Sequence, residues 1–156
     1  MDLTNQMPIA TKSSKVEISK ESSTAKLAKK FSRILKRGDT IFLHGEIGVG
    51  KTTFVRYLIN SFQKKNKKKL TEVTSPTFSI LNDYRIKNIT IKHYDLFRIK
   101  KMDEIKNIGL FENIDDFITI VEWPEKIKKK IKKRYDLFFK YNSYSEKRFI
   151  KIYKIK

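Results

Sequence analysis

The spacing of apolar residues in the first third of the chain predicts one amphipathic helix between two strands. Five apolar residues fall at helical spacing on one face: Leu27, Ala28, Phe31, Ile34 and Leu35. Ser22 or Ser23 can cap this helix, which we expect to end near Lys36, where Arg-Gly-Asp follows. Residues 40–44 form a short apolar run typical of a buried strand, and residues 16–18 suit a short edge strand.

Beyond residue 50 the pattern alternates between helical and strand-like segments. We expect helices over residues 51–62, 101–107 and 125–133, with Pro124 in the first turn of the last one. Residues 78–84 and 89–95 are predicted to pair antiparallel, residues 118–122 to form a buried strand, and residues 137–141 and 149–155 to form a hairpin. The chain therefore predicts an α/β fold whose mixed parallel/antiparallel sheet is flanked by helices.

Length and composition fit this picture and exclude several classes of protein. A chain of 156 residues suits one domain, which we place at residues 15–156, and the polar residues 1–14 are expected to form a flexible tail. No apolar run approaches the roughly 18 residues that a membrane span needs, so we expect no membrane segment and a cytoplasmic location. The absence of cysteine excludes a disulfide scaffold, a thiolate metal site and a cysteine nucleophile.

The charge distribution is strongly uneven. The chain has 36 Lys and Arg against 17 Asp and Glu, a formal net charge of +19 that suggests an anionic partner such as nucleic acid. Only 7 of these basic residues are arginine, which binds phosphate better than lysine does, so we favour a bias in codon supply as the explanation of the many lysines. Residues 103–125 instead hold seven acids and one lysine, which indicates a localised site or interface.

A glycine-rich segment between a predicted strand and a predicted helix carries the clearest chemistry. It reads Gly-Glu-Ile-Gly-Val-Gly-Lys-Thr over residues 45–52 and matches the P-loop pattern. Glycines let consecutive backbone N–H groups face a phosphate, and the start of the following helix directs its free N–H groups at the same anion. Lys51 would neutralise phosphate oxygens and the Thr52 hydroxyl would ligate Mg²⁺, which predicts a single P-loop NTPase domain.

A P-loop also needs an acid for the magnesium ion, and two candidates follow predicted strands. Glu122 ends the apolar run of residues 118–121, and Asp95 ends the strand of residues 89–94. Thr77, in the sequence Ser-Pro-Thr, lies in a region where many nucleotide switches place a threonine that senses the γ-phosphate.

Five sequence blocks occur in the order and spacing of one bacterial family. They are Gly-Glu-Ile-Gly-Val-Gly-Lys-Thr-Thr (45–53), Ser-Pro-Thr-Phe (75–78), His-Tyr-Asp-Leu-Phe-Arg (93–98), Asp-Glu-Ile-x-x-Ile-Gly-Leu (103–110) and Val-Glu-Trp-Pro (121–124). From residue 16 onward the chain resembles the TsaE family, the ATPase of tRNA threonylcarbamoyladenosine biosynthesis. The resemblance implies ATP and Mg²⁺ as cofactors, weak ATP hydrolysis alone, and docking on the TsaB and TsaD proteins, which modify tRNA.

The resemblance also assigns roles to individual residues. Thr52 and Glu122 match the Mg²⁺ ligands, Asp95 matches an acid needed for hydrolysis, and Thr77 matches a switch residue. The phosphate cradle corresponds to Glu46, Ile47, Gly48, Val49, Gly50, Lys51, Thr52 and Thr53.

Two further positions complete the expected site, and a third is expected to be structural. Glu21 falls at the N-terminal nucleotide contact of the family. Arg148 is the candidate for the C-terminal contact, although relatives often have Gly-Arg where this chain has Ser-Glu-Lys-Arg. His93 is expected to be a buried, hydrogen-bonded histidine rather than a catalytic one.

Two other functions compete with the ATPase. A small-molecule or nucleotide kinase shares the P-loop, but it also needs an acceptor site and an arginine-bearing lid, and the five arginines after Thr53 are scattered. A nucleic-acid-binding module would use the basic residues 64–69 and 126–134, but these runs lack interleaved arginine and aromatic residues.

Overall fold

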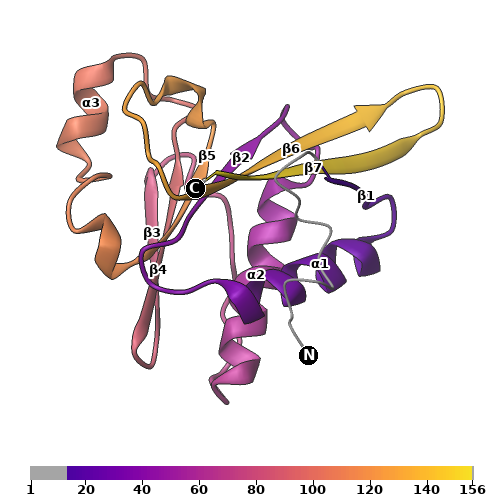
Figure 1. Cartoon of the computed structure of the whole chain (residues 1–156), viewed down its shortest axis with the longest axis horizontal. Coiled ribbons are helices and arrows are strands. Elements are labelled where there is room, and N and C mark those ends of the chain that lie inside the picture. The colour runs from indigo at the N-terminus through magenta and orange to yellow at the C-terminus, as the bar shows by residue number, and fades with distance from the viewer. Residues whose placement is uncertain (1–13, 156) are drawn as a thin grey trace.

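A mixed sheet of seven strands, in the order β1-β7-β6-β2-β5-β4-β3, organises the molecule (Figure 1). The computed structural model describes residues 14–155, so most of the expected tail of residues 1–14 lies outside the described residues. The inner strands β6, β2, β5 and β4 run parallel, and antiparallel pairs extend the sheet at both edges. The strands are β1 Ser14–Glu17, β2 Thr40–His44, β3 Leu81–Ile86, β4 Ile89–Asp95, β5 Ile118–Glu122, β6 Arg134–Asn142 and β7 Lys147–Ile155.

Helices cover both faces of the sheet. Helices α1 and α2 lie on one face, and the short α3 lies on the other (Figure 1). Side chains alternate along β2, so Ile41 and Leu43 join the core beneath α1 and α2, whereas Phe42 joins the core beneath α3. The helices are α1 Glu21–Ile34, α2 Lys51–Lys65 and α3 Met102–Asn107, with single 3₁₀ turns η2 Ile114–Asp116 and η3 Pro124–Lys126.

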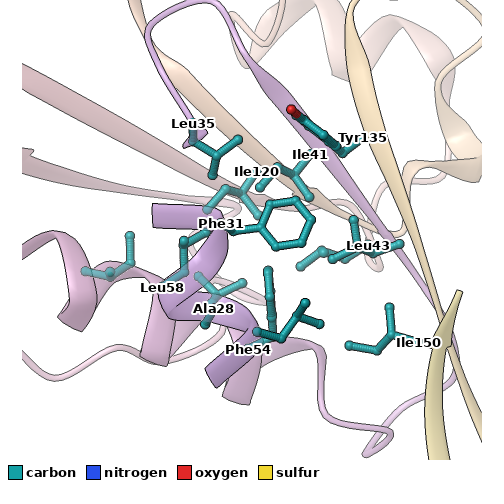
Figure 2. Packing of buried hydrophobic residues seen from close by; sticks show 14 of the residues in the cluster. Ala28, Phe31, Leu35, Ile41, Leu43, Phe54, Leu58, Ile120, Tyr135 and Ile150 are labelled. Carbon is teal, nitrogen blue, oxygen red and sulfur yellow. The ribbon is translucent and has the colours of Figure 1, made fainter. Parts of the chain in front are cut away.

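Aromatic residues anchor the larger core. The ring of Phe31 on α1 meets Phe54 on α2 edge to face, with 5.6 Å between the ring centroids, and meets Tyr135 on β6 in the same way at 5.4 Å. Figure 2 shows Phe31 between the two helices and the sheet, with Leu58, Leu43 and Ile120 around it. This packing fixes α2, and with it the end of the glycine-rich loop, against β2.

The mixed α/β fold is confirmed, and three details of the sequence prediction are wrong. Helix α1 begins at Glu21 with Lys20 as its N-cap, so neither Ser22 nor Ser23 caps it. Strand β3 begins at Leu81 rather than residue 78, because residues 77–80 form a turn in which Ile80 has a left-handed φ of 70°. The helix expected over residues 125–133 is only the 3₁₀ turn η3, since six lysines at helical spacing repel one another.

The other boundaries lie within a few residues of those expected, and β2, β4 and β5 match them fully. Within residues 14–155, no helix has the length and apolar character needed to cross a bilayer.

Candidate functional site

The carboxyl ends of three parallel strands bring the predicted chemistry to one edge of the sheet. In the strand register, Leu43 on β2 pairs with Glu122 on β5, and Glu122 pairs with Asp95 on β4. Ligands of open α/β sheets bind outside such carboxyl ends. The loop that leaves β2 at His44 therefore faces both predicted acids.

The glycine-rich loop has the backbone that its sequence predicts. Gly48 and Gly50 have positive φ angles of 77° and 114°, a region that other residues rarely adopt. A Cβ atom at either position would meet no atom within 4 Å, so the loop surface there is open. Gly50 is the N-cap of α2 and no side chain caps that helix end, which leaves the N–H groups of its first turn directed at the loop.

Lys51, the first residue of α2, is buried against the loop. Its Nζ donates hydrogen bonds to the backbone oxygens of Gly45 and Glu46, the latter at 2.8 Å, and lies 4.4 Å from the ring centroid of Trp123. Burial lowers the pKa of Lys51, and the charges of Glu122 and Asp95 partly oppose that shift. A cation removed from water in this way favours an anionic ligand.

Thr52 and Glu122 face each other across the site. The Thr52 hydroxyl donates to Glu122 Oε1 at 3.2 Å, and His93 Nε2 lies 2.8 Å from the same oxygen. His93 is fully buried, as expected, and its Nδ1 has no hydrogen-bond partner among residues 14–155. The tautomer that fits is therefore the one in which Nε2 carries the proton and donates to Glu122, because an unpaired buried N–H would cost more than an unpaired lone pair.

Asp95 accepts three hydrogen bonds that fix its carboxylate. The hydroxyls of Ser75 and Thr77 donate to Oδ2 at 2.6 and 2.9 Å, and the backbone N–H of Phe97 donates to Oδ1 at 2.9 Å. Thr77 thus lies beside Asp95, and its role as a switch residue stays a prediction. Ser75 was not among the predicted site residues, although two hydroxyl side chains on either side of a proline could have indicated a pair of donors.

Two cavities adjoin the loop on different sides and share Ile47 and Gly48. The first cavity, of about 370 Å³, is also lined by Gly50, Lys51, Thr52, Thr53, Thr77, Asp95 and Glu122. The second cavity, of about 510 Å³, is also lined by Glu46, Val49, Phe139, Lys140, Tyr141 and Arg148. Every predicted site residue except Glu21 therefore lines one of these two cavities.

Glu21 lies at the start of α1 and contacts α2. Its Oε1 accepts hydrogen bonds from the Tyr57 hydroxyl at 2.6 Å and from Arg56 at 2.8 Å. The bond from Tyr57 is the main cause of its lowered pKa, and Arg56 adds to it. Glu21 is absent from the residues that line the two cavities, so its predicted contact with a nucleotide stays a prediction.

A charged cluster beside the loop escaped the sequence analysis. His44, the last residue of β2, lies 3.0 Å from Glu125 in η3 and 3.0 Å from Asp136 on β6. Both partners are more than 80 residues away in the chain, so no local pattern linked them.

Comparisons with known proteins agree with this geometry. The model of the family described as "Threonylcarbamoyl adenosine biosynthesis protein TsaE" matches residues 18–150. The chain is 40% identical over 111 residues to the tRNA threonylcarbamoyladenosine biosynthesis protein TsaE of Rickettsia felis, covering 71% of this chain and 63% of that protein. It is 36% identical to the protein of the same name from Aquifex aeolicus, covering 72% of this chain and 78% of that one.

The fold also has a solved counterpart. The crystal structure of Bacillus subtilis YdiB superimposes with a TM-score of 0.70 at 23% identity, covering 92% of this chain and 86% of that one. The family match spans the loop, both acids and most of the sheet. The chain therefore belongs to the TsaE family, whose relatives carry the name of tRNA threonylcarbamoyladenosine biosynthesis proteins.

Proposed function

We propose that this chain is the Mg²⁺-dependent, ATP-binding and ATP-hydrolysing component of tRNA threonylcarbamoyladenosine biosynthesis, acting in the cytoplasm with TsaB and TsaD. The observation that carries the proposal is the first cavity, where Lys51, Thr52 and Glu122 meet at the start of α2. A buried lysine, a hydroxyl and a carboxylate at a helix N-terminus form the chemical set that P-loop ATPases use.

The triphosphate would lie along residues 46–53. The open backbone at Gly48 and Gly50 and the uncapped first turn of α2 supply N–H donors for phosphate oxygens. Lys51 holds its charge between the loop carbonyls and the two acids, and would give that charge to the phosphates.

The oxygen donors fit a magnesium ion that also keeps phosphate and water ligands. Within residues 14–155 no group of three or more His, Cys, Asp or Glu side chains is placed to hold a metal alone. Mg²⁺ is usually bound by one or two protein oxygens plus substrate phosphates, which matches the Thr52 hydroxyl and the Glu122 carboxylate. When bound, the ion would neutralise charge on the phosphate oxygens, and His93 would orient the Glu122 ligand.

The remaining predicted residues take supporting roles. Asp95, fixed by Ser75 and Thr77, would orient the attacking water, and Thr77 would respond to the γ-phosphate. Tyr141 and Arg148 line the second cavity, which has room for the nucleoside, and Arg148 is the proposed C-terminal contact.

The proposed partners would meet the mouth of the first cavity. Two large apolar side chains that line this cavity reach solvent, Ile47 with 73% and Phe97 with 43% exposed. Phe78, which follows the lining residue Thr77 in the chain, is 84% exposed. Exposed apolar side chains gathered at one place typically mark protein contacts. A contact with TsaB and TsaD there would explain weak hydrolysis by the chain alone, and tRNA would be reached through that complex.

The test is product analysis of ATP turnover with and without TsaB and TsaD. We expect release of inorganic phosphate, increased by the partners, and a loss of about 100-fold or more in Lys51→Ala, by analogy with the removal of one transition-state donor. Lys64→Ala is the matched control, because Lys64 is an exposed lysine near the far end of the same helix.

Two results would overturn the proposal. One is wild-type turnover by folded Lys51→Ala protein. The other is transfer of the phosphate to a small-molecule or nucleotide acceptor, which would make the chain a kinase.

A further inference from the structure

The imidazole of His44 lies between two carboxylates. Nδ1 is 3.0 Å from Glu125 Oε1, and Nε2 is 3.0 Å from Asp136 Oδ1. Carboxylate oxygens only accept hydrogen bonds, so both ring nitrogens must donate, and only the charged imidazolium carries two N–H groups. The geometry therefore describes a cation bridging η3 and β6.

The surroundings of His44 support the charged form. Its side chain is 16% exposed, and the Phe138 ring stacks on it with 4.1 Å between centroids. Burial acts against the charge, but the hydrogen bonds with Asp136 and Glu125 outweigh it, so the pKa of His44 is raised above the ordinary 6.5. Arg134 Nε donates to the other oxygen of Asp136 at 3.0 Å. Burial acts to raise the pKa of Glu125, but the hydrogen bond with His44 and smaller contributions, among them the charge of Lys51, together outweigh it, so this pKa is lowered.

This bridge connects two walls of the proposed ATP site. His44 directly precedes Gly45, whose carbonyl oxygen accepts a hydrogen bond from Lys51. Glu125 follows Trp123 by two residues, and the Trp123 ring lies against Lys51. Trp123 has a left-handed φ of 59°, which a bulky residue keeps only where its surroundings enforce it.

We propose that His44 is a positioning residue whose imidazolium fastens η3 to the P-loop strand and so keeps Trp123 against Lys51. The two contacts differ in what happens when the proton is lost. Asp136 is 8% exposed and its Oδ1 would be costly to leave without a partner, whereas Glu125 is 52% exposed and water can replace its partner. A neutral His44 therefore keeps Asp136 and releases Glu125, which loosens Trp123.

Trp123 itself supplies the readout, because it is the only tryptophan in the chain. Its fluorescence in the nucleotide-free protein should change as pH rises through the raised pKa of His44. Glu125→Gln and His44→Gln should both abolish that transition. Glu125→Gln is decisive: it removes an exposed carboxylate, should fold, and keeps the second histidine, His93, as an internal control. Asp103→Asn, which changes a carboxylate 90% exposed on α3, should keep the transition.

The free energy of unfolding provides an independent test, because the direction of its change with pH is fixed. Because the folded-state pKa of His44 lies above its unfolded value near 6.5, its stabilising contribution is complete below that value. The contribution is lost as pH rises through the folded-state pKa. The free energy of unfolding of the wild type should therefore fall over this window relative to His44→Gln.

A third test, which measures ATP affinity, is the only one of the three that rests on the proposed function. ATP affinity of the wild type should weaken about tenfold across the same window, as expected for losing one charged hydrogen bond at the site, and Glu125→Gln should be weak at every pH. If no ATP binds at any pH, the proposed function fails and the fluorescence still decides the role of His44. A fluorescence transition that persists in Glu125→Gln, or variants that lose stability with an unchanged pH profile, would overturn the positioning role.

Discussion

Asp95 and Glu122 are neighbours in the strand register but have different surroundings. Asp95 is held by two hydroxyls and a backbone N–H, whereas the contacts of Glu122 within residues 14–155 both fall on Oε1. Hydrogen bonds to both oxygens hold the Asp95 carboxylate in one orientation, which suits positioning of the attacking water. Glu122 has one oxygen without a hydrogen bond from the described residues, which suits metal binding. Substitutions of the two acids should therefore impair ATP binding and turnover to different extents.

We expect Glu122→Gln to weaken Mg²⁺-dependent ATP binding about tenfold and to slow turnover with it, because a metal ligand is lost. Asp95→Asn should leave binding within about twofold and slow turnover about 100-fold, because only the attacking step is affected. Calorimetric titration with and without Mg²⁺, alongside phosphate release, separates the two effects. Equal losses of ATP affinity in both variants would contradict this division of roles.

At the residue scale, most of the candidate site could be predicted from short local motifs in the sequence. The P-loop lies within eight consecutive residues, and each acid ends a predicted strand, so strand geometry alone brings them to one edge. The bridge of His44 to Asp136 was not predictable, because it joins β2 to β6 across a register that no single segment encodes.

At the scale of elements, burial decided which predictions succeeded. Strands β2, β4 and β5 lie inside the sheet, and an apolar run packed on both sides has few alternatives. The segment after Pro124 was predicted as a helix from its first-turn proline, yet its lysines repel at helical spacing and Trp123 turns the chain sharply. The start of β3 was misplaced because the turn that ends at Ile80 shows no glycine in the sequence.

The contact between α1, α2 and the sheet should dominate stability. Phe31→Ala removes a fully buried ring that touches both Phe54 and Tyr135, so we expect a loss of about 3–5 kcal/mol in the free energy of unfolding, measured by urea denaturation. Tyr144→Ala is the control, because that side chain is fully exposed and should change stability by no more than about 0.5 kcal/mol. Similar losses in both variants would contradict the assignment of the core to this contact.

At the scale of the whole molecule, the basic charge is unevenly placed relative to the site. Residues 64–69 hold five lysines at the end of α2 opposite the P-loop. A helix of 15 residues is about 22 Å long, well beyond the roughly 8 Å over which physiological salt screens charge. These lysines should therefore have little influence on a nucleotide at the other end of the helix.

Replacing Lys64, Lys65, Lys67, Lys68 and Lys69 with Ser tests this separation. ATP affinity should change by less than about twofold, because the charges are screened from the phosphates. We also expect tRNA modification with TsaB and TsaD to survive; a loss that is largest at low salt and shrinks as salt rises would instead indicate contacts with tRNA phosphates. A loss of ATP affinity itself would contradict the distance between this segment and the site.

The central position of β2 has a consequence for the order in which the protein is made. The strand leaves the ribosome early, but its two neighbours, β5 and β6, are synthesised much later. A nascent chain that stops before residue 118 therefore holds the P-loop on a strand with no partner on either side. Such long-range pairing is slow to form and leaves the segment exposed to other chains in the meantime. The complete site that would bind the nucleotide, which includes Arg148, can thus be assembled only after residue 148 has emerged.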